Sequence, residues 1–241
     1  MKAKITATAK YLPKKTLTNL DLEKMVDTSD EWILSRTGIE KRHLVSDGEA
    51  TSDMCKEVAL ELLKKSNKNP EEIDLILVAT STPDVPVVST AALVQDKIGA
   101  KNAWGYDIVA ACTGFVYALE TGAKLVESGK YKNVIVIGAD TMSSIIDYTD
   151  RNTCVIFGDG GGGVLLEPSD NDCGVLDSIL LADGSGHKYL TVPAGGSLRP
   201  ATKETIDKKM HYVFQDGKAV FKFAVKNMAD VSREILDKNN I

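Results

Sequence analysis

The sequence contains no long apolar run, no cluster of basic residues and few cysteines. No stretch approaches the roughly 20 apolar residues that a membrane helix needs. The N-terminal segment MKAKITATAKYLPKK has neither the apolar centre nor the cleavage site of a signal peptide. Lysine and arginine are dispersed and the net charge is −5, which argues against a nucleic-acid-binding protein. We therefore expect a protein that acts on neither membranes nor nucleic acids.

The four cysteines are Cys55, Cys112, Cys154 and Cys173, and they form no Cys-x-x-Cys pair. No histidine stands at the spacing of a zinc ligand. With 241 residues, 43% of them hydrophobic, the chain is large enough for a core that needs no disulfides. We predict no metal site, reduced thiols and a cytoplasmic location.

Hydrophobic spacing predicts an α/β fold. Three continuous apolar runs, 73–80, 103–110 and 132–139, are typical of strands covered on both faces. They alternate with helical patterns at 89–98 and 113–128. Strands that alternate with helices in this way predict parallel βαβ units, with helices on both faces of the sheet.

The other expected elements surround this centre. Helical spacing over 51–66 places Cys55 on the apolar face, so we interpret it as a core residue. Thr28 and Glu31 have capping-box spacing before a short helix that Gly38 ends. We also predict a strand at 2–9, a helix at 20–26, a hairpin of 153–157 with 163–166, a strand at 174–181 and a long helix at 217–239.

Cys112 stands where an apolar strand ends and a helix begins, in the stretch DIVAACTGFVYALETG. Ligands of α/β sheets bind at the carboxyl ends of strands. The unpaired N–H groups and the dipole of a helix N-terminus favour a thiolate, which is the nucleophilic form of cysteine. Gly114 would let a substrate carbonyl approach closely. From position alone, a small buried cysteine is an equally good interpretation.

Three blocks carry a family resemblance: AACTGF, DTSDEWILSRTGIEKRH and TDRNTCVIFGDGGGG. In these blocks and their spacing the chain resembles beta-ketoacyl-ACP synthase III, the initiating condensing enzyme of type II fatty-acid synthesis. The resemblance implies a thiolase-like α/β fold of two similar halves. It also implies that Cys112 takes an acyl group from acyl-CoA and that the enzyme condenses it with malonyl-ACP. Carbon dioxide is released, 3-oxoacyl-ACP is formed and no cofactor takes part.

The same resemblance assigns coenzyme A contacts to Thr28, Trp32, Arg36 and Arg151. Trp32 and Arg36 are four residues apart, on one side of a short helix. A flat ring and cationic side chains suit the adenine and the phosphates of CoA. Without the resemblance, a packed tryptophan and solvated arginines would be the better interpretation.

The segment 83–89 corresponds in the resembled family to a loop that lines the acyl channel of the partner subunit, at the interface of a homodimer. Val87 and Val88 occupy this loop, where many relatives carry an aromatic residue. The resemblance therefore implies a homodimer that works with acyl carrier protein. It leaves the preferred acyl chain open.

Gly158 to Gly163 reads GDGGGG and fits the letters of the dinucleotide motif G-x-G-x-x-G. That motif needs a following helix, whereas Val-Leu-Leu-Glu-Pro follows here and is strand-like. We reject nucleotide binding and predict a crowded turn in which only glycine fits.

The family's catalytic histidine and asparagine blocks are absent from the 241 residues. His43, His187 and His211 lie in polar segments, and we interpret them as surface residues. We expect one complete half at 1–168 and the beginning of a second at 169–241, hence a fragment of a longer gene product. Two rival functions remain: a condensing or acyl-transferring enzyme of secondary metabolism, and an inactive homologue that dimerises with an intact enzyme.

Overall fold

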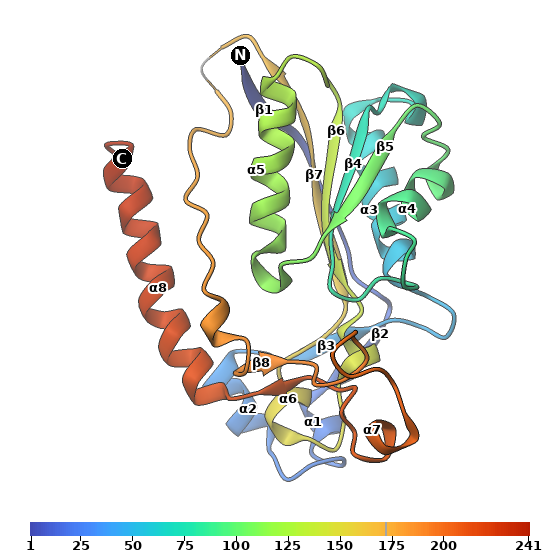
Figure 1. Cartoon of the computed structure of the whole chain (residues 1–241), viewed down its shortest axis with the longest axis vertical. Coiled ribbons are helices and arrows are strands. Elements are labelled where there is room, and N and C mark those ends of the chain that lie inside the picture. The colour runs from blue at the N-terminus through green and yellow to red at the C-terminus, as the bar shows by residue number, and fades with distance from the viewer. Residues whose placement is uncertain (172) are drawn as a thin grey trace. The chain divides into compact units, whose positions relative to one another are not determined.

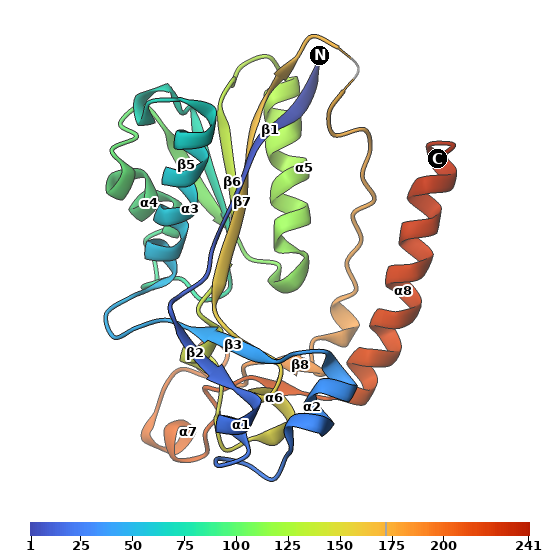
Figure 2. The ribbon, with the colours of Figure 1, turned by 180° about the vertical axis from the view of Figure 1, so that it is seen from behind.

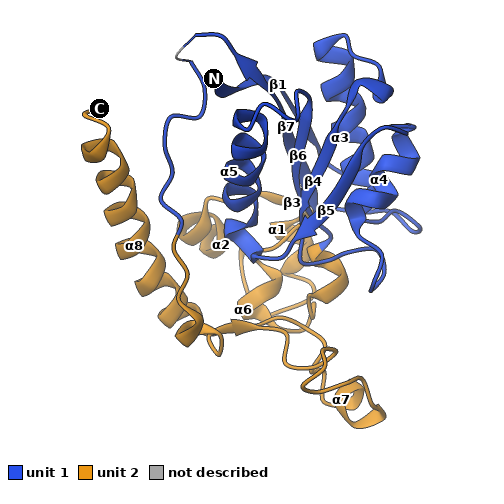
Figure 3. Cartoon of the chain, turned by 45° about the horizontal axis from the view of Figure 1, so that its top comes forward, with its two compact units in different colours: residues 1–15, 43–141, 159–180 blue, residues 16–42, 142–158, 181–241 orange. Residues whose placement is uncertain are grey.

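In a computed structural model, which describes residues 1–171 and 173–241, the chain forms two compact units. The first consists of residues 1–15, 43–141 and 159–180, and the second of residues 16–42, 142–158 and 181–241 (Figure 3). Asp172, near the start of the predicted second half 169–241, lies outside the described residues. The predicted division at residue 168 separates two similar halves of the fold and is a different division from that into compact units. It stays a prediction.

The first unit contains a five-stranded sheet. Its strand order is β1 (Lys2–Tyr11), β7 (Gly160–Ser169), β6 (Val134–Asp140), β4 (Leu75–Ala79) and β5 (Trp104–Ile108). Strand β4 pairs in parallel with both β5 and β6, whereas β7 runs antiparallel to β6 and to β1 (Figure 1). The predicted βαβ units therefore form the parallel part of this sheet.

Helices cover both faces of the sheet. α3 (Thr51–Ser66) and α4 (Thr90–Ile98) lie on one face and α5 (Gly114–Glu127) on the other (Figures 1 and 2). Every residue of β4 is buried, as its continuous apolar pattern predicts. Cys55 of α3 is fully buried in the core, and this burial raises the pKa of its thiol. Strand β5 is an edge strand, and the prediction that it is buried was wrong: none of its five described residues is buried.

The predicted glycine turn is wrong, because all four glycines Gly160–Gly163 lie inside strand β7. They are crowded, however, as expected. A Cβ added to Gly163 would lie 2.7 Å from the carbonyl oxygen of Val136 and 2.9 Å from Val58 of α3. Glycine is required here because α3 packs directly on the strand.

We expect Gly163→Ala to lower the free energy of unfolding by about 1–3 kcal/mol, the usual effect of forcing a methyl group into a packed core. Chemical denaturation measures this loss. Gly162→Ala is the matched control, since its Cβ would meet nothing closer than the Ala9 carbonyl oxygen at 3.7 Å. That variant is expected to be neutral or slightly stabilising. Equal losses in both would refute the close-approach explanation.

The second unit is built from short elements around a small core. Its elements are α1 (Asn19–Leu22), α2 (Asp30–Thr37), α6 (Arg151–Cys154), β8 (Leu190–Thr191), α7 (Lys203–Asp207), β9 (Phe214–Gln215) and α8 (Gly217–Lys238). The short strands β2 (Lys15–Thr18) and β3 (Lys41–Leu44) pair with each other, as do β8 and β9. Buried side chains of this core include Leu22, Ile33, Cys154 and Val213.

Several boundary predictions need correction. Thr28 does not cap α2, because the side chain of Ser29 accepts the hydrogen bond from the Trp32 N–H. The predicted strand at 153–157 begins as helix α6, which Asp150 caps. Residues 173–181 contain no strand in the described chain. Gly38 ends α2 at a φ of 70°, as predicted.

Helix α8 confirms the predicted long helix. It is amphipathic in sequence, yet none of its described residues is buried, and Phe221 and Met228 are largely exposed. No helix in 1–171 and 173–241 combines the length and the apolar character needed to cross a bilayer.

Candidate functional site

Cys112 lies in the turn that joins β5 to α5. The strand ends at Ile108, and a short 3-10 turn, Ala111–Thr113, carries the cysteine directly into the first turn of α5. Cys112 is exposed, so the interpretation as a small buried residue is wrong. The structure presents an accessible thiol at the carboxyl end of a strand and at the N-terminus of a 14-residue helix.

The backbone before Cys112 is strained. Ala111 has a φ of 45°, in the left-handed region that residues other than glycine rarely adopt. Such conformations persist only where the surrounding structure enforces them, and they concentrate at functional sites. Gly114 supplies part of this support, because it is buried and a Cβ there would lie 3.2 Å from that of Ala79. Gly114 thus serves the packing of α5 on β4, and the expected approach of a substrate carbonyl beside it stays a prediction.

The other cysteines differ from Cys112 in their surroundings. Cys55 and Cys154 are buried, and burial raises the pKa of both thiols. Cys173 is exposed but follows β7 and precedes no helix. Cys112 is therefore the exposed thiol that stands at a strand-to-helix junction.

In the second unit, the structure brings Trp32 and Arg151 together. The guanidinium carbon of Arg151 lies 4.4 Å from the centroid of the Trp32 ring, a cation–π distance. Trp32 is 37% exposed, whereas its neighbour Ile33 fills the core. The alternative interpretation of Trp32 as a core residue is wrong. Arg36 lies exposed in the last turn of α2, the helix that also carries Trp32.

Two polar atoms of the predicted CoA residues are buried without a partner. Among the described residues, neither Thr28 Oγ1 nor Arg151 Nε has a hydrogen-bond partner. Unsatisfied buried polar groups are rare and need a reason, of which an absent ligand is one. The predicted CoA residues Thr28, Trp32, Arg36 and Arg151 all belong to the second unit.

The histidines make local contacts. His43 Nδ1 lies 2.6 Å from the Pro13 carbonyl oxygen, and His211 Nε2 lies 2.9 Å from Thr205 Oγ1. Both are half-buried, so the prediction of solvated histidines holds only for the exposed His187. The described part of the chain holds no cluster of three or more metal-binding side chains.

The predicted acyl-channel residues lie in the first unit, between β4 and α4. Val87 is fully exposed and has a φ of 82°, an outlier for a β-branched residue. Val85 and Val88 are also exposed, at 47% and 46%. This segment follows the carboxyl end of β4, and Cys112 follows the carboxyl end of β5, its parallel neighbour.

A curated relative from Chlorobium chlorochromatii (strain CaD3), named beta-ketoacyl-[acyl-carrier-protein] synthase III, is 60% identical to the chain over 244 residues. The alignment covers 100% of this chain and 74% of the relative. The chain belongs to the beta-ketoacyl-[acyl-carrier-protein] synthase III family.

Further comparisons agree with membership of the beta-ketoacyl-ACP synthase III family. The family profile described as 3-Oxoacyl-[acyl-carrier-protein (ACP)] synthase III matches residues 106–184. A relative of the same name from Koribacter versatilis (strain Ellin345) is 54% identical, over 100% of this chain and 73% of that protein. The crystal structure of 3-oxoacyl-[acyl-carrier-protein] synthase III from Aquifex aeolicus VF5 is 43% identical, with a TM-score of 0.89, and covers 99% of this chain and 72% of that one. The resemblance and the thiolase-like α/β fold are confirmed.

One polar cluster of this beta-ketoacyl-ACP synthase III chain was missed by our sequence analysis. The Asp140 carboxylate accepts hydrogen bonds from Thr80 Oγ1 at 3.1 Å, Thr82 Oγ1 at 3.0 Å and the Ser81 N–H at 2.7 Å. It joins the carboxyl ends of β4 and β6, the edge from which the Cys112 turn also emerges. The sequence signal was there: polar residues directly follow two apolar strands.

Proposed function

We propose that Cys112 carries the acyl group in the condensing reaction that initiates fatty-acid synthesis. Its thiolate attacks the carbonyl carbon of acyl-CoA, a thioester forms, and CoA leaves and takes up a proton. Malonyl-ACP then loses carbon dioxide, and the resulting carbanion attacks the acyl group and releases Cys112. The product is 3-oxoacyl-ACP. The observation that carries the proposal is the exposed position of Cys112 at the N-terminus of α5.

The first turn of α5 stabilises two negatively charged species of this reaction, the thiolate and the tetrahedral intermediate. The dipole of α5 places partial positive charge beside the sulfur atom. This stabilises the attacking thiolate. The backbone N–H of Cys112 is available to donate a hydrogen bond to the negatively charged oxygen of the tetrahedral intermediate. The strained Ala111 holds the turn that presents the thiol.

Acyl-CoA would bind to the residues grouped around Trp32. The ring offers a stacking surface for adenine, and Arg151 and Arg36 supply positive charge for phosphates. Thr28 Oγ1 and Arg151 Nε, both buried and unpartnered in the described chain, fit polar groups of such a ligand. Because Arg151 covers one face of the Trp32 ring, adenine could stack on that face only after the guanidinium moves.

Decarboxylation needs donors that stabilise the developing enolate. In the resembled family these are a histidine and an asparagine in blocks that the 241 residues do not contain. Acyl loading needs the Cys112 thiol and the predicted coenzyme A contacts, and these belong to the 241 residues. No step of it uses a cofactor. It requires a free thiol and hence a reducing compartment, which we take to be the cytoplasm.

We also propose a homodimer, with acyl carrier protein as the other protein partner. Among the described residues, strand β5 pairs with β4 alone, which leaves its other edge unpaired. Trp104 of this strand is 46% exposed and stacks on Tyr106, with ring centroids 5.8 Å apart. An open, aromatic strand edge favours pairing with a second chain. Sedimentation analysis tests the dimer.

The function is tested by separating the two half-reactions. The purified chain is first incubated with acetyl-CoA, and intact mass and free CoA are measured. Malonyl-ACP is then added, and carbon dioxide release is followed. We expect an acetyl adduct and stoichiometric CoA. A folded chain that forms no adduct would refute the proposal and favour an inactive dimerising homologue. Condensation of the acetyl group with acceptors other than malonyl-ACP would instead favour an enzyme of secondary metabolism.

A further inference from the structure

A buried arginine links the segments that carry Trp32 and Arg151. Arg42 of strand β3 is only 3% exposed, and Asn19 of α1 is fully buried. One terminal nitrogen of Arg42 donates a hydrogen bond to Oδ1 of Asn19, and the other donates to the carbonyl oxygen of Val155. All of these residues belong to the second unit.

The bond to Val155 holds the end of α6. Val155 is the C-cap residue of this helix, and Arg151 is the first residue of the helix. The last carbonyl groups of a helix have no partner within it, and a cation at this end also interacts favourably with the helix dipole. The side chain of Asp150 caps the opposite end. The short helix that carries Arg151 is thus held at both ends.

The bond to Asn19 continues to the helix that carries Trp32. Nδ2 of Asn19 donates to Oδ1 of Asp30 at 2.8 Å and to the carbonyl oxygen of Ile39 at 2.8 Å. Asp30 is the first residue of α2, and Ile39 directly follows the glycine that ends it. The single amide group of Asn19 therefore contacts both ends of α2. Its oxygen faces the guanidinium and its nitrogen faces a carboxylate, so each bond polarises and strengthens the other.

The charge of Arg42 is costly where it lies. In the described chain its partners are two neutral oxygen atoms, and its Nε has no partner. Burial lowers the pKa of the guanidinium, because a charged group loses its hydration there. A buried charge is a poor source of stability. What the planar guanidinium does supply is direction, since it fixes two acceptors from different elements at once.

We infer that Arg42 and Asn19 are positioning residues that hold α2 and α6 in register and thereby preorganise the coenzyme A site. The inference rests on the proposed binding of acyl-CoA at Trp32. The Arg151 guanidinium lies 4.4 Å from the centroid of the Trp32 ring, although the two side chains come from different helices. A ligand that uses both side chains binds more tightly when the helices are already in place. Loss of the register should raise the KM for acyl-CoA and leave the attack by Cys112 unchanged.

Two substitutions interrupt the network at different points. Arg42→Met removes the charge and both hydrogen bonds but keeps much of the volume of the side chain. Asn19→Asp gives the guanidinium a carboxylate partner, but it cannot donate to Asp30 and repels it. The first variant releases both helices, and the second releases α2 while Arg42 stays paired.

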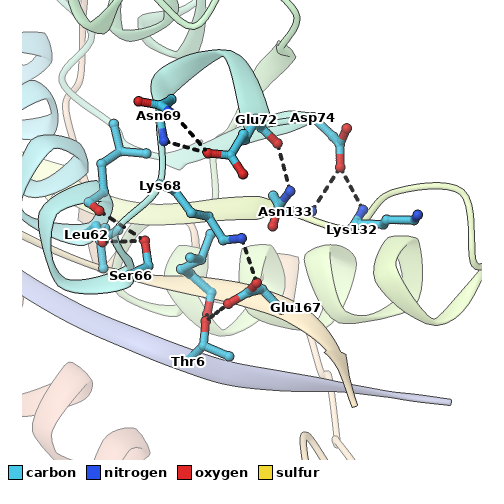
Figure 4. A network of polar contacts seen from close by, with 12 residues as sticks. Thr6, Leu62, Ser66, Lys68, Asn69, Glu72, Asp74, Lys132, Asn133 and Glu167 are labelled. Carbon is cyan, nitrogen blue, oxygen red and sulfur yellow. Dashed lines mark hydrogen bonds and ion pairs between the residues drawn. The ribbon is translucent and has the colours of Figure 1, made fainter. Parts of the chain in front are cut away.

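Lys68 provides the control, because it is a partly buried cation of the first unit. Its Nζ lies 2.9 Å from Oε1 of Glu167, and the Thr6 hydroxyl donates to the same carboxylate (Figure 4). None of these three residues belongs to α2 or α6. Lys68→Met removes a paired charge and should lower stability without changing the coenzyme A site.

The experiment measures the rate of acetyl loading over a range of acetyl-CoA concentrations. We expect Arg42→Met and Asn19→Asp to raise the KM by roughly tenfold, a typical coupling within one hydrogen-bond network. The maximal rate should stay within about twofold of the native value, and Lys68→Met should change both constants by less than about twofold. In a Trp32→Ala background, Arg42→Met should raise the KM by less than about twofold, because the contact that it supports is already lost.

An unchanged KM in a folded Arg42→Met variant would overturn the inference. An equal rise in Lys68→Met, or a full rise in the Trp32→Ala background, would overturn it too and make Arg42 merely structural. If Arg42→Met does not fold, Asn19→Asp, in which the guanidinium remains paired, decides in the same way.

If the native chain neither binds nor loads acetyl-CoA, the proposed function fails, and fluorescence without a ligand decides the positioning step. In a Trp104→Phe background, Trp32 is the only tryptophan. Arg42→Met should shift its emission toward that of Arg151→Ala, because both variants take the guanidinium away from the ring. An emission that Arg151→Ala changes and Arg42→Met leaves unchanged would overturn the inference.

Discussion

Replacing Cys112 by serine is expected to abolish acyl loading, with a fall in rate of roughly a thousandfold or more. A serine hydroxyl remains protonated near neutral pH, and a helix N-terminus cannot make it an effective nucleophile without a general base. The measurement is the intact mass of the protein after incubation with acetyl-CoA, together with the release of free CoA. The native chain should gain one acetyl group and the variant none.

Cys173→Ser is the matched control for this result. Cys173 is also exposed, but it lies outside a strand-to-helix junction. Its replacement should leave both the extent and the rate of loading unchanged. If the Cys112→Ser variant still acquired the acetyl group and Cys173→Ser lost it, the nucleophile would be misassigned.

Removing the aromatic surface of the second unit is expected to weaken acyl-CoA binding strongly. Trp32→Ala should raise the KM for acyl-CoA loading by roughly ten- to hundredfold, in line with the loss of one base-stacking contact. Arg151→Ala should have a similar effect through its phosphate and cation–π contacts. The maximal loading rate should change little, since these residues bind the substrate rather than attack it. The rate of the single CoA release, measured over a range of acyl-CoA concentrations, gives both constants.

A second cation–π pair in the same unit provides the control. Lys188 lies 5.2 Å from the ring centroid of Tyr189, and Tyr189→Ala should leave the KM unchanged. The chain has two tryptophans, so Trp104→Phe leaves Trp32 as the only one. Its fluorescence should change when the adenine of CoA stacks on the ring. A KM that does not respond to Trp32→Ala would place CoA elsewhere.

Helices and strands whose apolar residues follow one regular pattern were predictable from the sequence. Helix α3 spans the 51–66 segment expected from its apolar spacing, and β4 lies within its predicted run. The glycine run was not predictable as a strand, because glycine has low strand propensity and favours turns. Pairing with β1 and β6 on both sides overrides that propensity. Around α6, the β-branched residues of the sequence favour a strand. In the structure, the side chain of Asp150 caps the N-terminus of α6 and a helix forms instead.

The candidate site was predictable only in part, for a similar reason. Cys112 is recognisable because its strand-to-helix junction is local in the sequence. The contact of Trp32 with Arg151 is not, since spacing cannot relate residues so far apart, and only the family resemblance connected them. The roles of Arg42 and Asn19 were not predictable, because the groups that bond to their side chains come from other segments of the chain.

The pairing of β1 affects how the chain folds while the ribosome synthesises it. Within the part of the chain that the structure describes, β1 pairs in the sheet with β7 alone, and Lys2 lies opposite Ser169. A ribosome that has just produced β1 therefore has to synthesise the chain as far as β7 before β1 can pair with its partner strand. During this time the strand edge is open to other nascent chains. Lys2, Lys4 and Lys10 interrupt its β-forming sequence, and such charges discourage unwanted pairing.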